Sequence, residues 1–359
     1  MKRAPRRRTR QIKYGALAVG GDAPVSVQSM STYPAAEKDA TLEEIASLAS
    51  AGCELVRVAV RDDADIDALP SICGGSVLPV VADIHFDAGL AVRASSAGVA
   101  GLRINPGNIG GEAKVREVIE AAERAGIPVR VGVNAGSLER DLRLLYRSEP
   151  AAALCESAVR HLEMIERFGF GDLVFSLKSS DPEVTVEANR LFAARCDYPV
   201  HLGVTEAGPA LGGAARSVVA LTLLLVDGIG DTVRISLSGD PVREVIVAAA
   251  MLSALGLRAD IPRIVSCPTC GRKRIDVTDL AERLEREVMG LRRRVTVAVM
   301  GCEVNGPGEA KEADIGIAGA RDGAVLFKRG MVVRRLSKDF AREFVREVRE
   351  FLGEDTAGE

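Results

Sequence analysis

The 359-residue sequence lacks the marks of membrane, secreted and nucleic-acid-binding proteins. Its longest apolar runs, residues 218–226 and 245–252, are far shorter than the roughly 20 residues of a membrane-spanning helix, so we expect core helices there and no membrane segment. No apolar segment follows the basic residues near the N-terminus as a signal peptide requires, which predicts a cytoplasmic protein. A net charge of −3 and few aromatic residues argue against nucleic-acid binding, and we interpret the basic N-terminal arm as a solvated tail.

The sequence also lacks the cysteine pattern of a disulfide-stabilised protein. An odd count of seven cysteines without an export signal argues against a disulfide framework. With 47% hydrophobic residues the chain can form a large core instead. Four cysteines stand singly in apolar segments and are predicted to be small buried side chains: Cys53, Cys73, Cys155 and Cys196. The other three, Cys267, Cys270 and Cys302, lie among Gly, Pro and polar residues.

The first 260 residues alternate short apolar runs with amphipathic stretches. Helices are predicted at residues 41–51 and 112–125, the second closed by Gly126. Eight strands alternating with helices are typical of a (β/α)8 barrel. An open doubly wound sheet is the alternative, although no GxGxxG follows the first strand. The eight predicted strands begin at Val25, Leu55, Val77, Gly101, Val129, Asp172, Val200 and Thr232.

Polar residues keep one parity within these strands, and alternate residues of a strand point to opposite faces. If the apolar residues of each strand pack on the helices, the polar residues between them point into the barrel, near the strand ends where barrel active sites form. This parity carries Arg57, Arg103, Arg130, Lys178 and Arg234, against the acids Asp83 and Glu206. A surplus of three positive charges predicts a site for a multiply charged anion such as a diphosphate. Structural ion pairs are the alternative interpretation.

The C-terminal part of the chain, about 95 residues, forms a second unit, so we place one domain at residues 1–262 and the other at 263–359. The pattern predicts a compact α+β unit with helices at 278–291 and 337–352. Strands are expected at 295–302, 314–318, 324–328 and 331–336.

The three unusual cysteines of this unit can hold a metal. A Cys-x2-Cys pair brings Cys267 and Cys270 to one ion or cluster, and Cys302 adds a third sulfur. Structural zinc ordinarily has a fourth Cys or His ligand, but the last histidine is His201. Three sulfurs are consistent with an iron-sulfur cluster, with Glu309 as the candidate oxygen ligand. Zinc and metal-free thiols remain open alternatives.

Long motifs make the chain resemble a known family over nearly its whole length, from about Arg8 to about Phe351. The chain closely resembles the bacterial 4-hydroxy-3-methylbut-2-enyl diphosphate synthases (IspG/GcpE family) in its two-domain form. The resemblance rests on VQSM, ELVRVAV, ADIHF, LRINPGNIG, VRVGVNAGSLE, SLKSSD, HLGVTEAG, GIGDTVRISLSGDP, SCPTCGR and VMGCEVNGPGEAKEADIGIAG.

The resemblance implies an oxidoreductase of the non-mevalonate isoprenoid pathway that reductively opens a cyclic diphosphate with a [4Fe-4S] cluster. Cys267, Cys270, Cys302 and Glu309 correspond to the family's cluster ligands. The implied diphosphate-binding residues are Arg57, Arg103, Arg130, Asn134, Lys178, Arg234 and Ser236. Glu206 corresponds to a barrel acid with a plausible proton-donating role. Reduced flavodoxin or ferredoxin is the implied electron donor, and the implied homodimer forms its site from one chain's barrel and the other's cluster domain.

Two positions depart from the family pattern. Ser31 replaces a threonine and keeps its hydroxyl, whereas Glu303 stands where an apolar residue is common. An ionised Glu303 near the cluster is expected to lower its reduction potential. Two other functions remain as alternatives: a non-catalytic iron-sulfur electron carrier with a scaffold barrel, and a zinc-stabilised barrel hydrolase. The five basic residues at inward-facing strand positions argue against the electron carrier, because a scaffold barrel is expected to fill its mouth with apolar side chains.

Overall fold

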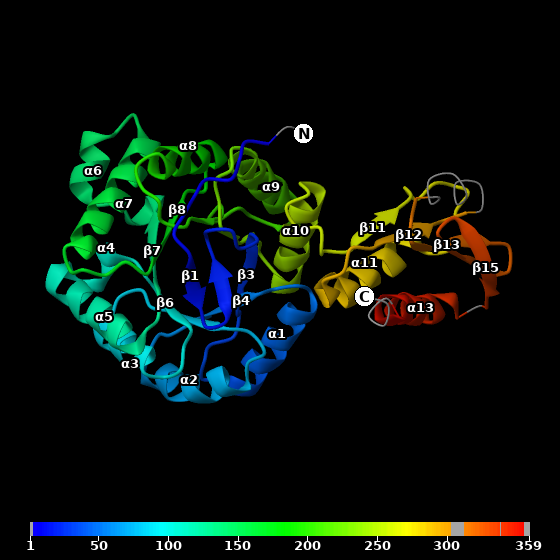
Figure 1. Ribbon diagram of the computed structural model, residues 1–359, viewed down its shortest axis with the longest axis horizontal. Helices are drawn as coiled ribbons and strands as arrows, with labels where there is room; N and C mark the ends of the chain where they lie inside the picture. The colour runs from blue at the N-terminus through cyan, green and yellow to red at the C-terminus, as the bar shows by residue number, and fades with distance from the viewer. Residues whose placement is uncertain (1–2, 303–311, 338, 355–359) are drawn as a thin grey trace. The chain divides into compact units, whose positions relative to one another are not determined.

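The computed structural model describes residues 3–302, 312–337 and 339–354. The chain divides into two compact units, one formed by residues 1–49 and 53–251 and the other by residues 50–52 and 252–359. Each unit has a sheet and a hydrophobic core of its own (Figure 1). Among the described residues, no helix has the length and apolarity needed to cross a membrane.

The first unit is a barrel of eight parallel strands, which confirms the predicted (β/α)8 fold. The sheet has the order β8-β7-β6-β5-β4-β3-β10-β9, and a parallel bridge between Phe175 and Val200 joins its two edges. The strands are β3 (Ser26–Met30), β4 (Leu55–Ala59), β5 (Val80–Asp83), β6 (Gly101–Ile104), β7 (Val129–Asn134), β8 (Leu173–Lys178), β9 (His201–Leu202) and β10 (Thr232–Val233).

Helices follow the strands and surround the barrel, as Figure 1 shows. They are α1 (Lys38–Ser50), α2 (Asp63–Gly75), α3 (Ala88–Ser95), α4 (Pro106–Ile109), α5 (Gly111–Ala125), α6 (Arg140–Leu145), α7 (Pro150–Glu166), α8 (Pro182–Ala193), α9 (Ala210–Val226) and α10 (Pro241–Ala254). The predicted stop of α5 is confirmed, because Gly126 caps it in the left-handed region with a φ of 65°. Strands β9 and β10 are shorter than predicted. Beyond them, pairing continues through single hydrogen bonds, such as Arg234 N to Leu202 O at 2.9 Å.

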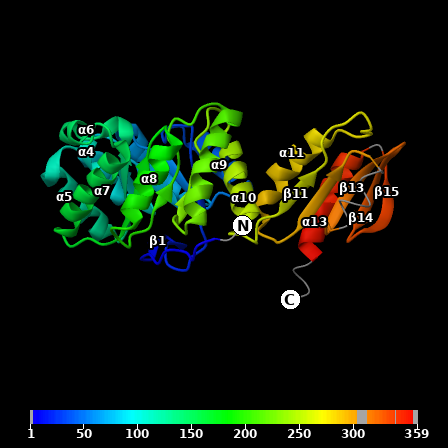
Figure 2. The ribbon, with the colours of Figure 1, turned by 90° about the horizontal axis from the view of Figure 1, so that it is seen from above.

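A hairpin that the sequence analysis did not predict covers one end of the barrel (Figures 1 and 2). It consists of β1 (Ile12–Tyr14) and β2 (Leu17–Val19). Its Tyr14 is buried with Leu55, Val81 and Val174, which lie near the starts of their strands. The hairpin therefore closes the N-terminal end of the barrel and leaves the opposite end, with the strands' C-termini, for the site.

The basic N-terminal arm is bonded to the barrel, so the interpretation as a solvated tail is wrong. Arg6 pairs with Asp231 at 2.8 Å, and Arg7 donates to the carbonyls of Cys196 and Tyr198. Backbone bonds from Ala4, Arg7 and Arg10 add to these contacts. The guanidinium groups bind loop carbonyls before β9 and a buried carboxylate before β10, which accounts for the two basic residues Arg6 and Arg7 of the arm.

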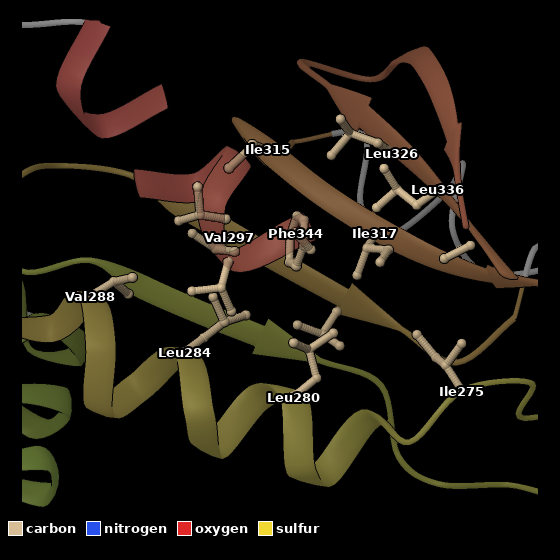
Figure 3. Packing of buried hydrophobic residues seen from close by; sticks show 14 of the residues in the cluster. Ile275, Leu280, Leu284, Val288, Val297, Ile315, Ile317, Leu326, Leu336 and Phe344 are labelled. Carbon is tan, nitrogen blue, oxygen red and sulfur yellow. The ribbon is translucent and has the colours of Figure 1, made fainter. Parts of the chain in front are cut away.

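The second unit is a five-stranded mixed sheet with two helices on one face. Its order is β11-β12-β13-β14-β15, parallel over the first three strands and antiparallel over the rest. The strands are β11 (Arg263–Ser266), which the sequence analysis did not predict, β12 (Thr296–Met300), β13 (Ile315–Ala320), β14 (Gly323–Lys328) and β15 (Met331–Leu336). The helices α11 (Val277–Val288) and α13 (Phe340–Glu354) pack Leu280, Leu284 and Phe344 against Val297 and Ile317 of the sheet (Figure 3).

Candidate active site

The predicted inward parity of the barrel strands is visible in contacts that cross the barrel. Arg130 of β7 donates a hydrogen bond to Oε1 of Gln28 on β3, and these two strands are not neighbours in the sheet. Glycines provide room for such long side chains. A Cβ at Gly132 would lie 2.7 Å from Arg103 Nη2, and one at Gly203 would lie 2.6 Å from Lys178 Nζ. The basic side chains therefore occupy the interior.

Asp83, at the end of β5, joins two of the arginines. Its Oδ2 lies 3.3 Å from Arg57 Nε, and its Oδ1 lies 3.1 Å from Arg103 Nη1. Burial alone raises the pKa of Asp83, but Arg57, the hydrogen bond to His85 and Arg103 outweigh burial and hold the pKa well below its usual value. Arg103 Nη1 also lies 2.8 Å from His85 Nε2. Asp83 is therefore an ionised carboxylate that orients both guanidinium groups.

Arg130 and Lys178 are buried without a carboxylate of their own among the described residues. Burial, followed by the charge of Arg103, lowers the pKa of Arg130 to about 10. Burial and then Arg130 and Arg57 lower the pKa of Lys178 well below its ordinary value. Both groups lose hydration and face like charges, so an anion entering this space would stabilise their charged forms.

Arg234 has a partner that the sequence analysis did not identify. Its Nη2 lies 3.2 Å from Oε2 of Glu244, a buried residue of α10. The same carboxylate accepts hydrogen bonds from Leu237 N at 2.8 Å and from Ser29 Oγ at 3.3 Å. The sequence contained one signal for this pair, because Glu244 is a single acid within the apolar sequence of α10. Its partner Arg234 was not identified, because a loop separates the two residues.

The remaining predicted site residues lie at the C-terminal ends of the strands. Asn134 ends β7 in register with Lys178, and both Asn134 and Ser236 are half-buried. Glu206 lies in an exposed loop after β9 with a φ of 52°, in the left-handed region that few non-glycine residues adopt. The described barrel thus gathers five inward cations around two buried carboxylates, Asp83 and Glu244, and the predicted surplus of three charges remains.

A polar layer lies next to these cations in the barrel interior. Ser26, Thr232 and His201 are adjacent in register on β3, β10 and β9, and all three are buried. Within the part of the chain that the structure describes, their hydroxyl and ring nitrogen atoms have no hydrogen-bond partner. Burial and the charges of Arg130 and Lys178 lower the pKa of His201 well below its ordinary value, so the imidazole is neutral at pH 7.

The second unit places its cysteines at neighbouring strand ends. Cys267 follows β11, Cys302 follows β12, and Gly301 N lies 3.1 Å from Cys267 Sγ. Cys302 is buried, Cys267 is half-buried and Cys270 is exposed. No three His, Cys, Asp or Glu side chains of the described residues lie close enough to hold a metal ion. Glu309 and Glu303 lie outside the described residues.

The four isolated cysteines lie in the barrel unit. Cys53 and Cys155 are buried, whereas Cys73 and Cys196 are half-buried. Burial raises the pKa of the Cys53 thiol to about 12 and that of Cys73 to about 11. These values favour the unreactive thiol form at neutral pH, as expected of packing residues.

Comparisons with known proteins cover both units. Residues 9–249 match the family model of the GcpE TIM-barrel domain, and residues 263–350 match that of the GcpE protein C-terminal domain. A Geobacter sulfurreducens protein is 51% identical over 348 residues, with 97% of this chain and 99% of that protein covered. A Natranaerobius thermophilus protein is 48% identical over 350 residues, with 97% and 98% covered. Both relatives are named 4-hydroxy-3-methylbut-2-en-1-yl diphosphate synthase (flavodoxin).

Proposed function

Because the chain belongs to the GcpE family, we propose that it is a 4-hydroxy-3-methylbut-2-en-1-yl diphosphate synthase. The proposed substrate is 2-C-methyl-D-erythritol 2,4-cyclodiphosphate, and the product is (E)-4-hydroxy-3-methylbut-2-enyl diphosphate. Two electrons and two protons enter the reaction. The ring carbon–oxygen bond to the diphosphate breaks, and one hydroxyl of the substrate leaves as the single water. This is an oxidoreductase step of the non-mevalonate pathway to isoprenoids.

The surplus of inward-facing positive charge in the barrel carries this proposal. Arg57, Arg103, Arg130, Lys178 and Arg234 exceed the buried carboxylates by three, so the interior suits a compact anion of several charges. Guanidinium groups bind phosphate oxygens through paired hydrogen bonds. As the ring opens, negative charge grows on the diphosphate, and these fixed cations are placed to stabilise it. Asn134 and Ser236 are proposed to contact the same anion.

We propose that Cys267, Cys270, Cys302 and Glu309 hold a [4Fe-4S] cluster. The chemistry of the donors suits it, because the second unit has three thiols at one end of the sheet, and Gly301 leaves space beside Cys267 Sγ. The bound cluster supplies single electrons. On this proposal, Glu309→Ala retains part of the cluster and loses most turnover. Glu206 is proposed as a proton donor because it lies in the loop that follows β9.

Two partners complete the proposal. Reduced flavodoxin or ferredoxin donates the electrons, and the names of the relatives favour flavodoxin. A second copy of the chain forms a homodimer in which one chain's cluster domain acts on the other's barrel. An apolar stripe on α9 supports a homodimer, because Leu211, Val219 and Leu223 are 89%, 57% and 46% exposed. Sedimentation of Leu223→Asp, with the α5 variant Glu117→Lys as control, tests this surface.

Turnover by the reconstituted protein tests the proposed reaction. Purified protein is loaded anaerobically with iron and sulfide, which should reach about four of each per chain, and is given the cyclic diphosphate with dithionite. Formation of the linear diphosphate is expected. A cluster-loaded protein that forms none would refute the reaction and favour the electron-carrier alternative, whereas a colourless protein containing zinc would favour the hydrolase.

A further inference from the structure

Three strands of the second unit bring their C-terminal ends to one edge of the sheet. Strands β11, β12 and β13 are parallel, so Cys267, Cys302 and Arg321, which follow them, lie along the same edge. Hydrogen bonds fix the Cys267–Arg274 loop there. Lys273 N donates to Cys270 O at 3.1 Å, and Arg274 N donates to Gly301 O at 2.7 Å. Cys267, Cys270 and Cys302 thus lie at the same edge of the sheet as residues 272–274.

This segment carries three consecutive cations, and a fourth lies close by. Arg272, Lys273, Arg274 and Arg321 are all exposed, and we call these four residues the basic edge. A Cβ at Gly319 would lie 3.1 Å from Arg274 Cβ, so Arg274 lies beside the end of β13, next to Arg321. Within the described ranges, no carboxylate forms an ion pair with the basic edge. The nearby Asp276 instead caps α11 by accepting from Thr278 N and Asp279 N.

Among the described residues, the basic edge has no ion-pair partner that would explain its charge. Other cations of this unit have such partners: Arg334 pairs with Glu343 and Glu347, and Lys328 pairs with Glu347. Four like charges at one edge, without partners in the described chain, repel one another and weaken the fold locally unless something negative binds. Cys270 is exposed within the same loop, so a protein docked on the basic edge would lie next to a proposed cluster ligand.

We propose that the basic edge is the docking surface for an acidic electron-carrier protein of the flavodoxin class. This inference rests on the proposed function, because it assumes that electrons enter through the cluster held by Cys270. Exposed charges of one sign steer a carrier of opposite sign and raise its rate of association, and their effect decreases with ionic strength. Docking here would place the carrier beside the exposed Cys270, which is proposed to hold the cluster.

Single charge reversals at the basic edge test the proposal. The variants are Lys273→Glu and Arg321→Glu. The matched control is Arg294→Glu, because Arg294 is exposed but precedes β12 and so lies at the opposite edge of the sheet. Binding of oxidised flavodoxin to each cluster-loaded protein is followed by the fluorescence anisotropy of labelled flavodoxin at low and high salt. Turnover is measured in parallel with reduced flavodoxin and with dithionite, a small reductant that needs no docking surface.

Each reversal is expected to weaken flavodoxin binding at low salt by roughly tenfold, to lower flavodoxin-driven kcat/KM in proportion, and to lower dithionite-driven turnover much less. The control should match the wild type. Unchanged binding in both variants, or an equal loss of turnover with both reductants, would overturn the proposal. Failure of the proposed function can be distinguished from failure of the docking proposal. If the function is wrong, the wild type forms no product with dithionite, whatever its affinity for flavodoxin.

Discussion

Glu244 places its Oε2 3.2 Å from Arg234 Nη2, inside a barrel that otherwise has an excess of positive charge. The pair links helix α10 to the strand end that carries a proposed diphosphate ligand. Its carboxylate also accepts from Leu237 N, so it fixes the loop after β10 as well as the guanidinium group. Arg234 is thereby oriented before any substrate arrives.

Replacing Glu244 with Gln should therefore destabilise the protein in the absence of substrate. The neutral amide leaves the half-buried Arg234 without a countercharge, and we expect the free energy of unfolding to fall by roughly 1–3 kcal/mol. Urea unfolding measures the loss. Inorganic diphosphate should recover more stability in this variant than in the wild type, because it supplies Arg234 with a negative partner. An equal gain in both proteins would contradict the role of the pair.

Arg130 should affect binding and stability differently. Arg130→Met removes a charged phosphate contact, so we expect Kd for the cyclic diphosphate to rise roughly tenfold or more. The stability of the substrate-free protein should not fall comparably, because the variant also relieves repulsion from Arg103. Titration calorimetry and thermal unfolding measure the two effects, with the exposed Arg143→Met as control. Unchanged affinity would show that Arg130 does not contact the substrate.

Lys178 should make substrate binding depend on pH. Its folded pKa is lowered from 10.5 by burial and by the arginines, so between the lowered value and 10.5 the unfolded chain binds more protons than the folded one. Stability of the substrate-free protein therefore rises with pH across that window. A bound diphosphate favours the charged amine, so binding takes up a proton and affinity falls as pH rises. Calorimetry in buffers of different ionisation enthalpy detects the uptake, and Lys178→Met should abolish it.

The N-terminal arm should contribute measurably to stability through Asp231. This buried carboxylate accepts from Arg6 Nη2 at 2.8 Å, Thr9 Oγ1 at 3.1 Å and Val200 N at 2.8 Å. Asp231→Asn and Arg6→Met should each lower the free energy of unfolding by roughly 1–3 kcal/mol. The double variant should lose less than the sum, because both changes break one interaction. Strict additivity in this cycle would show that the arm and Asp231 act independently.

Sequence patterns were sufficient where the information is local. The residues flanking Arg57, Arg103, Arg130 and Lys178 in their strands are apolar, so a period of two identified their common face. Partners were harder to predict, because Gln28 reaches Arg130 from a strand 102 positions away, and Glu244 reaches Arg234 from helix α10, beyond a loop. The N-terminal arm was misinterpreted for the same reason. Its charges resemble those of a solvated tail until the fold brings Asp231 and the carbonyls of Cys196 and Tyr198 next to them.

The contact between Arg6 and Asp231 also constrains how the chain is made. The two residues are 225 positions apart, so Arg6 is synthesised long before the last barrel strand and binds only after that strand has formed. Such nonlocal closure slows folding, because much loop entropy is lost before the contact forms. An affinity tag fused at the N-terminus would lie close to Ala4, whose amide bonds to Val226 O at the end of α9. A tag at the C-terminus would not interfere with the binding of the N-terminal arm to the barrel.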